Sequence, residues 1–213
     1  MEVFHTAEIS ESDFDQIVST LHRGGVIGFP TDTSYGLGAD AFNSLAIDRL
    51  FQIKGRADTK AILVLVDSME MAASITHFNP SFRQVAEKFW PGPLTLIIPA
   101  DPRLPLNLTG GTGAIGVRWP AASFASTLVH RFGKPITATS ANRSGMPSSV
   151  TVAEVRAQLG DTVDVLIDGG RLPHRQGSTL LDLTVDPPVV LREGPISFEI
   201  LHEFFHGRIL RKI

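Results

Sequence analysis

A short apolar segment followed at once by a run of polar side chains places the strongest constraint on the fold. Residues 26–29 are apolar and start with β-branched side chains, which predicts a short buried strand. The next nine residues, 30–38, hold three threonine or serine hydroxyls, a phenol, a carboxylate and two glycines, and a helical pattern starts near Asn43. We therefore expect a strand-to-helix loop over residues 30–38, where Gly36 and Gly38 permit positive φ and close approach of the backbone to a ligand. Open α/β sheets bind ligands at such loops.

Three cations follow this loop. Lys54 is expected to end the helix, and Arg56 and Lys60 precede the next apolar strand, residues 62–66. One interpretation is a lysine that favours a helix C-terminus and two ordinary surface charges. The other is phosphate binding, because arginine offers a planar fork to phosphate oxygens and lysine a mobile point charge. A hydroxyl-rich loop beside these cations indicates a small ligand that carries polar groups and phosphate.

The rest of the chain first alternates predicted helices and strands, and then places several strands in succession. This order predicts an α/β fold with a mixed, twisted sheet. The expected helices begin near Ser10 and at positions 44, 68, 80, 125, 152 and 198, and the expected strands cover 62–66, 94–98, 114–118, 136–139, 164–168, 179–185 and 189–193. Segments 101–113 and 140–150 are expected to be loops. We expect one domain over residues 1–213, with its core at about 10–195 and a C-terminal helix at about 197–206.

Charge and composition exclude several classes of protein. The net charge is −3 and the pI is about 6.1, so the surface as a whole is not a nucleic-acid footprint. The chain has no cysteine, which excludes disulfides, thiol nucleophiles and thiolate metal sites. We see no signal-peptide pattern at Met1 and no apolar run of transmembrane length. The expectation is a cytoplasmic protein that does not enter a membrane.

A series of motifs resembles the YrdC-like family, the threonylcarbamoyl-AMP synthases. The series covers about residues 10 to 195, and it is specific because the motifs occur in the family's order. It departs from the family at Ala57 and Ala61, which stand where prolines are usual and so affect the expected stiffness of that loop. The matching stretches are 30–38 with Lys54-x-Arg56, 89–95, 116–120, 140–145, 178–182 and 191–194.

The resemblance implies a function and an architecture. The fold would be a single open twisted mixed sheet with flanking helices and a concave, positively lined face. The enzyme would be a nucleotidyltransferase that makes threonylcarbamoyl-AMP from L-threonine, bicarbonate and ATP, and releases pyrophosphate. Mg²⁺ would arrive with ATP, held mostly by phosphates and water. The product would serve threonylcarbamoyladenosine modification of tRNA through a separate downstream transferase.

The resemblance also implies residue roles. Lys54 and Arg56 would stabilise charge during catalysis, and we assign no nucleophile, no general base and no protein ligand to a metal. The residues implied for ATP are Arg56, Lys60, Ala114, Ser140, Asn142, Ser148 and Arg192. The residues implied for threonine are Thr33, Tyr35, Arg118, Ala138 and Ser178.

Structural interpretations of these residues stay open at this point. A loop threonine such as Thr33 commonly bonds its own backbone. The loop at 140–150 would then be a capped turn, and Arg192 would form a salt bridge with Glu193 or Asp182. Arg118 ends an apolar strand and needs either an anionic partner or solvent.

Two further strings match motifs in letters alone. Gly111-x-Gly113-x-x-Gly116 has the spacing of a dinucleotide fingerprint, but it leads into a strand rather than a helix. We expect a loop there whose backbone approaches the nucleotide. His202-Glu203-x-x-His206 matches a zinc-peptidase motif on a predicted helix, but no carboxylate side chain follows it as a third ligand. Besides that zinc reading, the alternatives are an RNA-binding module with a basic concave face and a paralogue without synthase activity.

Overall fold

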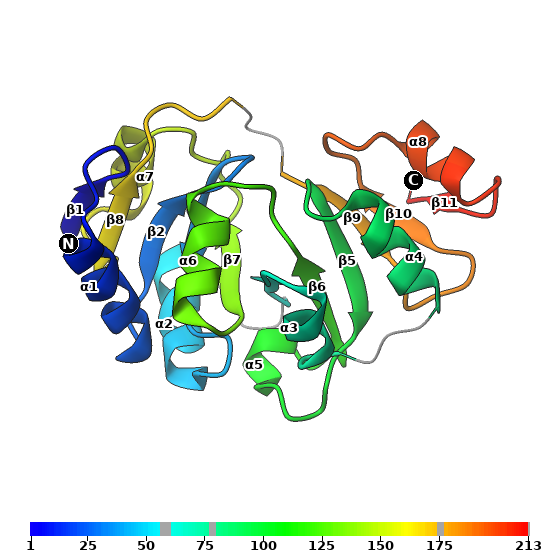
Figure 1. The fold of residues 1–213 in the computed structure, drawn as a ribbon, viewed down its shortest axis with the longest axis horizontal. Helices are drawn as coiled ribbons and strands as arrows, with labels where there is room; N and C mark the ends of the chain where they lie inside the picture. Colours follow the sequence, from blue (N-terminus) through cyan, green and yellow to red (C-terminus); the bar gives the residue numbers. More distant parts are fainter. Residues whose placement is uncertain (56–60, 77–79, 174–176, 213) are drawn as a thin grey trace.

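A computed structural model describes residues 1–55, 61–76, 80–173 and 177–212. In these residues eleven strands form one mixed sheet, and its edge strands β1 and β11 lie at opposite ends of the molecule (Figure 1). The strands, in their order across the sheet, are β1 (Glu2–His5), β8 (Val165–Asp168), β2 (Ile27–Pro30), β3 (Tyr35–Gly38), β7 (Ile136–Ser140), β4 (Leu63–Leu65), β6 (Ala114–Arg118), β5 (Leu94–Pro99), β9 (Thr179–Asp182), β10 (Val189–Arg192) and β11 (Leu210–Arg211).

Helices connect and cover these strands, and most begin where the sequence supplies a cap. Ser10 accepts from the Asp13 amide and Asp13 bonds back to Ser10, which forms a capping box at the first helix. Asn43 caps the second, and Gly55 ends it in the left-handed conformation. The helices are α1 (Glu11–His22), α2 (Ser44–Lys54), α3 (Met69–Ala73), α4 (Pro80–Phe89), α5 (Leu106–Thr109), α6 (Phe124–Phe132), α7 (Val152–Leu159) and α8 (Phe198–Phe204).

The sheet buries both of its faces at the end that carries β8. Successive side chains of a strand point to opposite faces, and on β8 Val165 and Ile167 join one core cluster while Leu166 joins the other. The first cluster also contains residues of α1 and α6, which Figure 1 shows in front of the sheet. Leu65 of β4 and Ala138 of β7 belong to this same cluster, so the face that α1 and α6 cover continues toward the middle of the sheet.

The architecture confirms the predicted α/β fold with an open, twisted, mixed sheet and flanking helices. Parallel pairs such as β5 with β9 occur beside antiparallel pairs such as β5 with β6. The successive strands expected at 179–185 and 189–193 are present as β9 and β10, which pair antiparallel.

The prediction for residues 30–38 was wrong in one respect. Tyr35–Gly38 form strand β3, antiparallel to β2, so the loop covers only the four residues between these strands. Gly36 and Gly38 are not among the glycines with positive φ. A Cβ at Gly38 would lie 2.6 Å from the Phe29 ring and 2.8 Å from the Ile136 side chain. Close packing between strands, rather than unusual backbone, therefore explains Gly38.

Three short segments were also missed. The predicted loop 101–113 contains the one-turn helix α5, which the left-handed Gly110 ends. Strands β1 and β11 form the two edges of the sheet and were not predicted.

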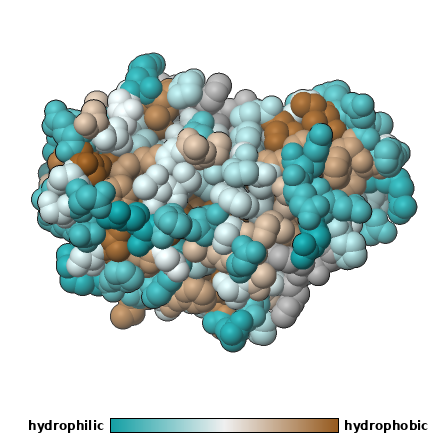
Figure 2. All heavy atoms as spheres, in the orientation of Figure 1, coloured by the Kyte–Doolittle hydropathy of each residue, from teal (hydrophilic) through white to brown (hydrophobic). Residues whose placement is uncertain are grey.

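A helix long and apolar enough to cross a membrane is absent from the described residues. Hydrophilic residues cover much of the face in Figure 2, and hydrophobic residues gather at the end that carries α8, where Ile200 is exposed.

Candidate active site

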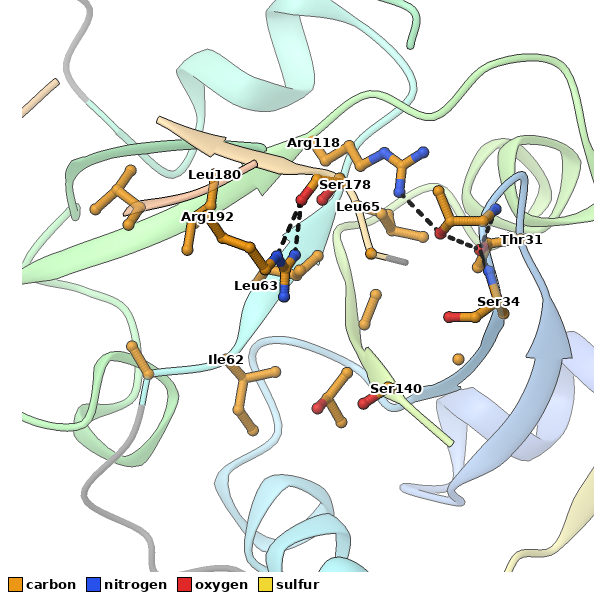
Figure 3. Close-up of a pocket in the computed structure, with 18 of the residues that line it drawn as sticks. Thr31, Ser34, Ile62, Leu63, Leu65, Arg118, Ser140, Ser178, Leu180 and Arg192 are labelled. Atoms are coloured by element: carbon orange, nitrogen blue, oxygen red, sulfur yellow. Dashed lines mark hydrogen bonds between the residues drawn. The ribbon is translucent and has the colours of Figure 1, made fainter. Parts of the chain in front are cut away.

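A cavity of about 690 Å³ lies on the middle of the sheet. Strand alternation builds its floor, because every second residue of a strand faces the same side. Thus Ala114, Gly116 and Arg118 of β6 border the cavity, as do Leu180 and Asp182 of β9. Figure 3 shows Arg118 and Ser178 together at one side, Thr31 and Ser34 facing them, and Ser140 with Ile62 at the opposite side.

Thr31 organises the loop between β2 and β3. Its hydroxyl donates to the Ser34 carbonyl at 2.7 Å and accepts from the Thr33 and Ser34 amides at 3.1 and 3.2 Å. It also lies 3.0 Å from the Thr33 hydroxyl. The expected local bonding of a loop threonine therefore falls on Thr31, and it places the hydroxyl of Thr33 at the cavity beside Arg118.

Arg118 is 4% exposed at the end of β6. Its Nε donates to the Gly92 carbonyl at 3.0 Å, its Nη1 lies 3.5 Å from the Thr33 hydroxyl, and its Nη2 donates to the carboxylate of Asp32. Burial lowers the pKa of Arg118, and the Asp32 charge opposes that shift. Asp32 is thus the anionic partner that the sequence called for, although we had not named it as a site residue. The signal was present, because Asp32 is the one carboxylate in the hydroxyl-rich run.

A second arginine, Arg192, reaches the same cavity from β10. Its Nε and Nη2 both donate to the Ser178 carbonyl, at 3.1 and 2.8 Å, and the Ser178 hydroxyl lies 2.6 Å from that of Thr95. The salt bridge considered for Arg192 does not form within the described residues, since Glu193 pairs with Arg211. Desolvation lowers the pKa of Arg192. A buried guanidinium, that of Arg118, and an exposed one, that of Arg192, therefore face the same cavity.

Lys54 lies behind the cavity rather than in it. It is 3% exposed, and its ammonium donates to the backbone carbonyls of Ser140 and of Asn142, the latter at 3.0 Å. Asn142 is also turned away, because its Nδ2 donates to the carbonyls of Arg143 and Met146 at 2.8 and 2.6 Å. Lys54 therefore anchors the loop that presents Ser140 and Ser148 to the cavity, and its expected role in charge stabilisation stays a prediction.

Tyr35 borders the cavity, but its hydroxyl is used elsewhere. The hydroxyl donates to the Gly170 carbonyl at 2.8 Å and accepts from the Gly169 amide at 3.0 Å. Desolvation raises the pKa of Tyr35 to about 12. This bonding ties β3 to the end of β8. The expected contact between Tyr35 and threonine stays a prediction.

The other predicted residues divide by position. Arg56, Lys60 and Ala57 lie outside the described residues. Ala61, Ala114, Ala138 and Ser178 border the cavity. Sequence reasoning missed Thr112, Asp182 and Thr184, which border it as well. Asp182 stood in a quoted motif, and its alternation with Ser178 and Leu180 along a strand was the signal that could have identified it.

Neither of the two strings that match a motif has the structural context which that motif requires. Gly111 and Gly113 have positive φ of 72° and 69° in a loop, and Gly116 is a strand residue, so this stretch lacks the strand-to-helix context of a dinucleotide fingerprint. His206 lies beyond the end of α8 with φ of 51°, so it does not share a helical face with His202. Within the described ranges no group of three or more His, Cys, Asp or Glu side chains is placed to hold a metal ion.

Comparison with known proteins agrees with the motif series. The model of the Sua5/YciO/YrdC family, described as Telomere recombination, matches residues 19–194. A threonylcarbamoyl-AMP synthase from Pyrococcus abyssi is 37% identical over 180 residues, which are 84% of this chain and 53% of that protein. A putative threonylcarbamoyl-AMP synthase from Mycobacterium tuberculosis is 38% identical over 187 residues, covering 87% of this chain and 86% of that protein.

A solved structure extends the comparison to three dimensions. The crystal structure of P. abyssi Sua5 complexed with L-threonine superposes with a TM-score of 0.91 at 33% identity, over 98% of this chain and 62% of that chain. The present chain therefore spans only a little more than half the length of the P. abyssi protein.

Proposed function

Because the chain belongs to the Sua5/YciO/YrdC family, we propose that it is a threonylcarbamoyl-AMP synthase. One observation carries the proposal: a single cavity collects the buried Arg118, the exposed Arg192, the hydroxyls of Thr33 and Ser178, and the hydroxyls of the loop at 140–150. Guanidinium groups favour anionic partners, and the three substrates L-threonine, bicarbonate and ATP supply carboxylate, carbonate and phosphate groups.

Threonine occupies the end of the cavity at Arg118 in this proposal. The guanidinium keeps donors beyond those that Gly92, Thr33 and Asp32 use, since arginine carries five N–H groups in a planar fork. These donors fit the substrate carboxylate, and the Thr33 and Ser178 hydroxyls and the small side chain of Ala138 border the same space. The L-threonine complex of P. abyssi Sua5 supports the choice of amino acid.

ATP fills the remainder of the cavity. Arg192 presents the edge of its guanidinium that Ser178 does not use, and Ser140, Ser148 and Ala114 border the space. Arg56 and Lys60, which lie outside the described residues, are proposed as further phosphate ligands. Mg²⁺ enters with ATP on phosphate oxygens and water, because Asp182 is the only carboxylate among the described side chains that border the cavity.

The chemistry then needs position and charge more than a nucleophilic side chain. The neutral amine of threonine attacks the carbon of CO₂ or bicarbonate and gives a carbamate, with water released from bicarbonate. A carbamate oxygen attacks the α-phosphorus of ATP, and the bond from that phosphorus to the bridging oxygen of pyrophosphate breaks. The Arg192 guanidinium stabilises the negative charge that develops on the phosphate oxygens. Holding three reactants together lowers the entropic part of the barrier.

The product, threonylcarbamoyl-AMP, would pass to a separate transferase that modifies adenosine in tRNA. Direct RNA binding is less favoured by the site, because an RNA backbone is bound by several exposed cations, whereas the described side chains of the cavity include one exposed cation, Arg192, beside the buried Arg118.

Product analysis tests the proposal directly. Protein, magnesium-ATP, L-threonine and bicarbonate are mixed, and pyrophosphate and threonylcarbamoyl-AMP are measured together. Pyrophosphate release is expected only when threonine and bicarbonate are both present. Equal release without threonine would show that the protein is not this synthase.

A further inference from the structure

A single carboxylate, Asp182, faces a cavity whose other described charges are the two arginines. It ends β9, and the alternation that buries Leu181 turns Ser178, Leu180 and Asp182 toward the cavity. Asp182 comes four positions after Ser178, a span of roughly 13 Å along an extended strand. The carboxylate therefore lies at the far end of β9. Ser178 precedes the start of this strand and lies near Arg118 (Figure 3).

Register places Asp182 near the residues proposed for the nucleotide. Asp182 lies opposite Ile97 on β5, and Ile97 lies opposite Gly116 on β6. Ala114 comes two residues earlier on β6 and, like Ile97 and Gly116, borders the cavity. Gly116, Ile97 and Asp182 therefore lie side by side on three neighbouring strands. They form a part of the cavity floor that has no side chain at Gly116, an apolar one at Ile97 and a carboxylate at Asp182.

The two oxygens of Asp182 have different surroundings. Oδ1 accepts from the Thr184 amide at 2.8 Å and from the Thr184 hydroxyl at 2.6 Å, which holds the side chain in one orientation. Oδ2 has no hydrogen bond or ion pair to any of the described residues. An ionised carboxylate is an acceptor only. The free oxygen can therefore receive a donor from a ligand without disturbing the turn.

Charge decides which part of a ligand suits this position. A carboxylate repels phosphate and attracts neutral hydrogen-bond donors. In ATP such donors are the ribose hydroxyls and the exocyclic amine of adenine, and the phosphates belong beside Arg192. Resting on the proposed function, we propose that Asp182 binds the nucleoside part of ATP by accepting a hydrogen bond from one of these donors, and so contributes to nucleotide selectivity.

Asp182→Asn is the sharpest variant for a test. Asparagine keeps an oxygen for the amide and hydroxyl of Thr184, and replaces the free acceptor with an N–H donor. Asp186→Asn is the matched control, since Asp186 lies in the same hairpin, is 83% exposed and is not among the described residues that border the cavity. Thermal unfolding of both variants verifies that they fold.

Calorimetric titrations then compare four nucleotides: ATP, 2′-deoxy-ATP, 3′-deoxy-ATP and inosine triphosphate. The wild type is expected to bind one of the three analogues about tenfold more weakly than ATP, the effect of one lost hydrogen bond. In Asp182→Asn that preference disappears, because ATP falls to the affinity of the analogue. Which analogue responds identifies the donor as a ribose hydroxyl or the adenine amine. Asp186→Asn behaves as the wild type.

Three outcomes would overturn the inference. If Asp182→Asn keeps the full preference for ATP over every analogue, the side chain does not contact the nucleoside. If the variant loses ATP affinity only when Mg²⁺ is present and loses it equally for all four nucleotides, Asp182 acts on the metal instead. If the wild type binds no ATP, both this inference and the proposed function fail. If wild type and Asp182→Asn bind ATP equally well, only this inference fails.

Discussion

Arg118 and Asp32 form an ion pair inside the protein, between the end of β6 and the loop that joins β2 to β3. Their side chains are 5% and 17% exposed, and the Arg118 Nη2 donates to the Asp32 carboxylate. The pair connects two segments that are 86 residues apart in the chain. It holds the guanidinium in place at the cavity and partly compensates for its burial.

The first prediction concerns this pair. Asp32→Ala is expected to lower the free energy of unfolding by roughly 3–5 kcal/mol, because Arg118 is left as a buried charge without its anion. Saturating L-threonine should restore part of the loss, since its carboxylate replaces the anion. Urea denaturation with and without threonine measures both effects. Asp67→Ala is the control: Asp67 pairs with the exposed His130, so a loss below about 1 kcal/mol is expected. Equal losses in the two variants would contradict the prediction.

The second prediction assigns threonine binding to Arg118 and ATP binding to Arg56. Arg118→Ala should weaken threonine binding by well over tenfold and leave ATP affinity within a few-fold, because removing a buried charge-assisted contact costs roughly 2–5 kcal/mol. Arg118→Lys should restore little, since an ammonium does not reproduce the planar fork. Arg56→Ala should have the reverse effect and also slow the chemical step. Separate calorimetric titrations with each ligand measure this, and an Arg118→Ala protein that loses ATP but keeps threonine would reverse the assignment.

The third prediction concerns Lys54. Lys54→Met keeps the length of the side chain but removes the donor to the Ser140 and Asn142 carbonyls, at an expected cost of roughly 1–3 kcal/mol. Amides of the loop at 140–150 should exchange hydrogen faster, and ATP affinity should fall because the loop is less ordered. Lys134→Met is the control, since that ammonium is 3.4 Å from Asp40 and 47% exposed. Unchanged exchange in the loop would argue against a positioning role for Lys54.

The fourth prediction uses the only tyrosine of the chain. Desolvation raises the pKa of Tyr35 from 10.0 to about 12. A raised pKa favours the protonated form in the folded state, so this contribution to stability is complete below pH 10 and is lost as the pH rises from 10 to about 12. Tyrosinate absorbance of the folded protein should therefore show a midpoint near 12. In urea denaturation Tyr35→Phe should lose stability less steeply over this range, and a midpoint near 10 would contradict the burial argument.

The fifth prediction concerns metal. His202→Ala should leave the rate of synthesis unchanged, because His202 packs against the Phe198 ring with centroids 5.6 Å apart and does not share a helical face with His206. Elemental analysis of the purified protein should find no stoichiometric zinc. A zinc content of one per chain would restore the peptidase interpretation.

Much of the fold followed from local patterns. The helical pattern expected to start near Asn43 is α2, and Thr151 and Ser197 cap the helices α7 and α8 where helices were expected to begin. Strand β3 was not readable, because two of its four residues are glycines, which weaken strand propensity. The edge strands β1 and β11 are short, and they depend on partners distant in sequence.

The sequence alone determined the fold class, the family through its ordered motifs, and several of the residues at the cavity, because these depend on periodicity and on residue types a few positions apart. Only the tertiary structure decided what each polar side chain does. The Tyr35 hydroxyl bonds the backbone of Gly169 and Gly170, Lys54 donates to the backbone of a loop 86 residues away, and Asp182 borders the cavity with one oxygen held by Thr184. A hydrogen bond depends on distances of a few tenths of an ångström between distant segments, and these distances exist only once the sheet has brought the segments together.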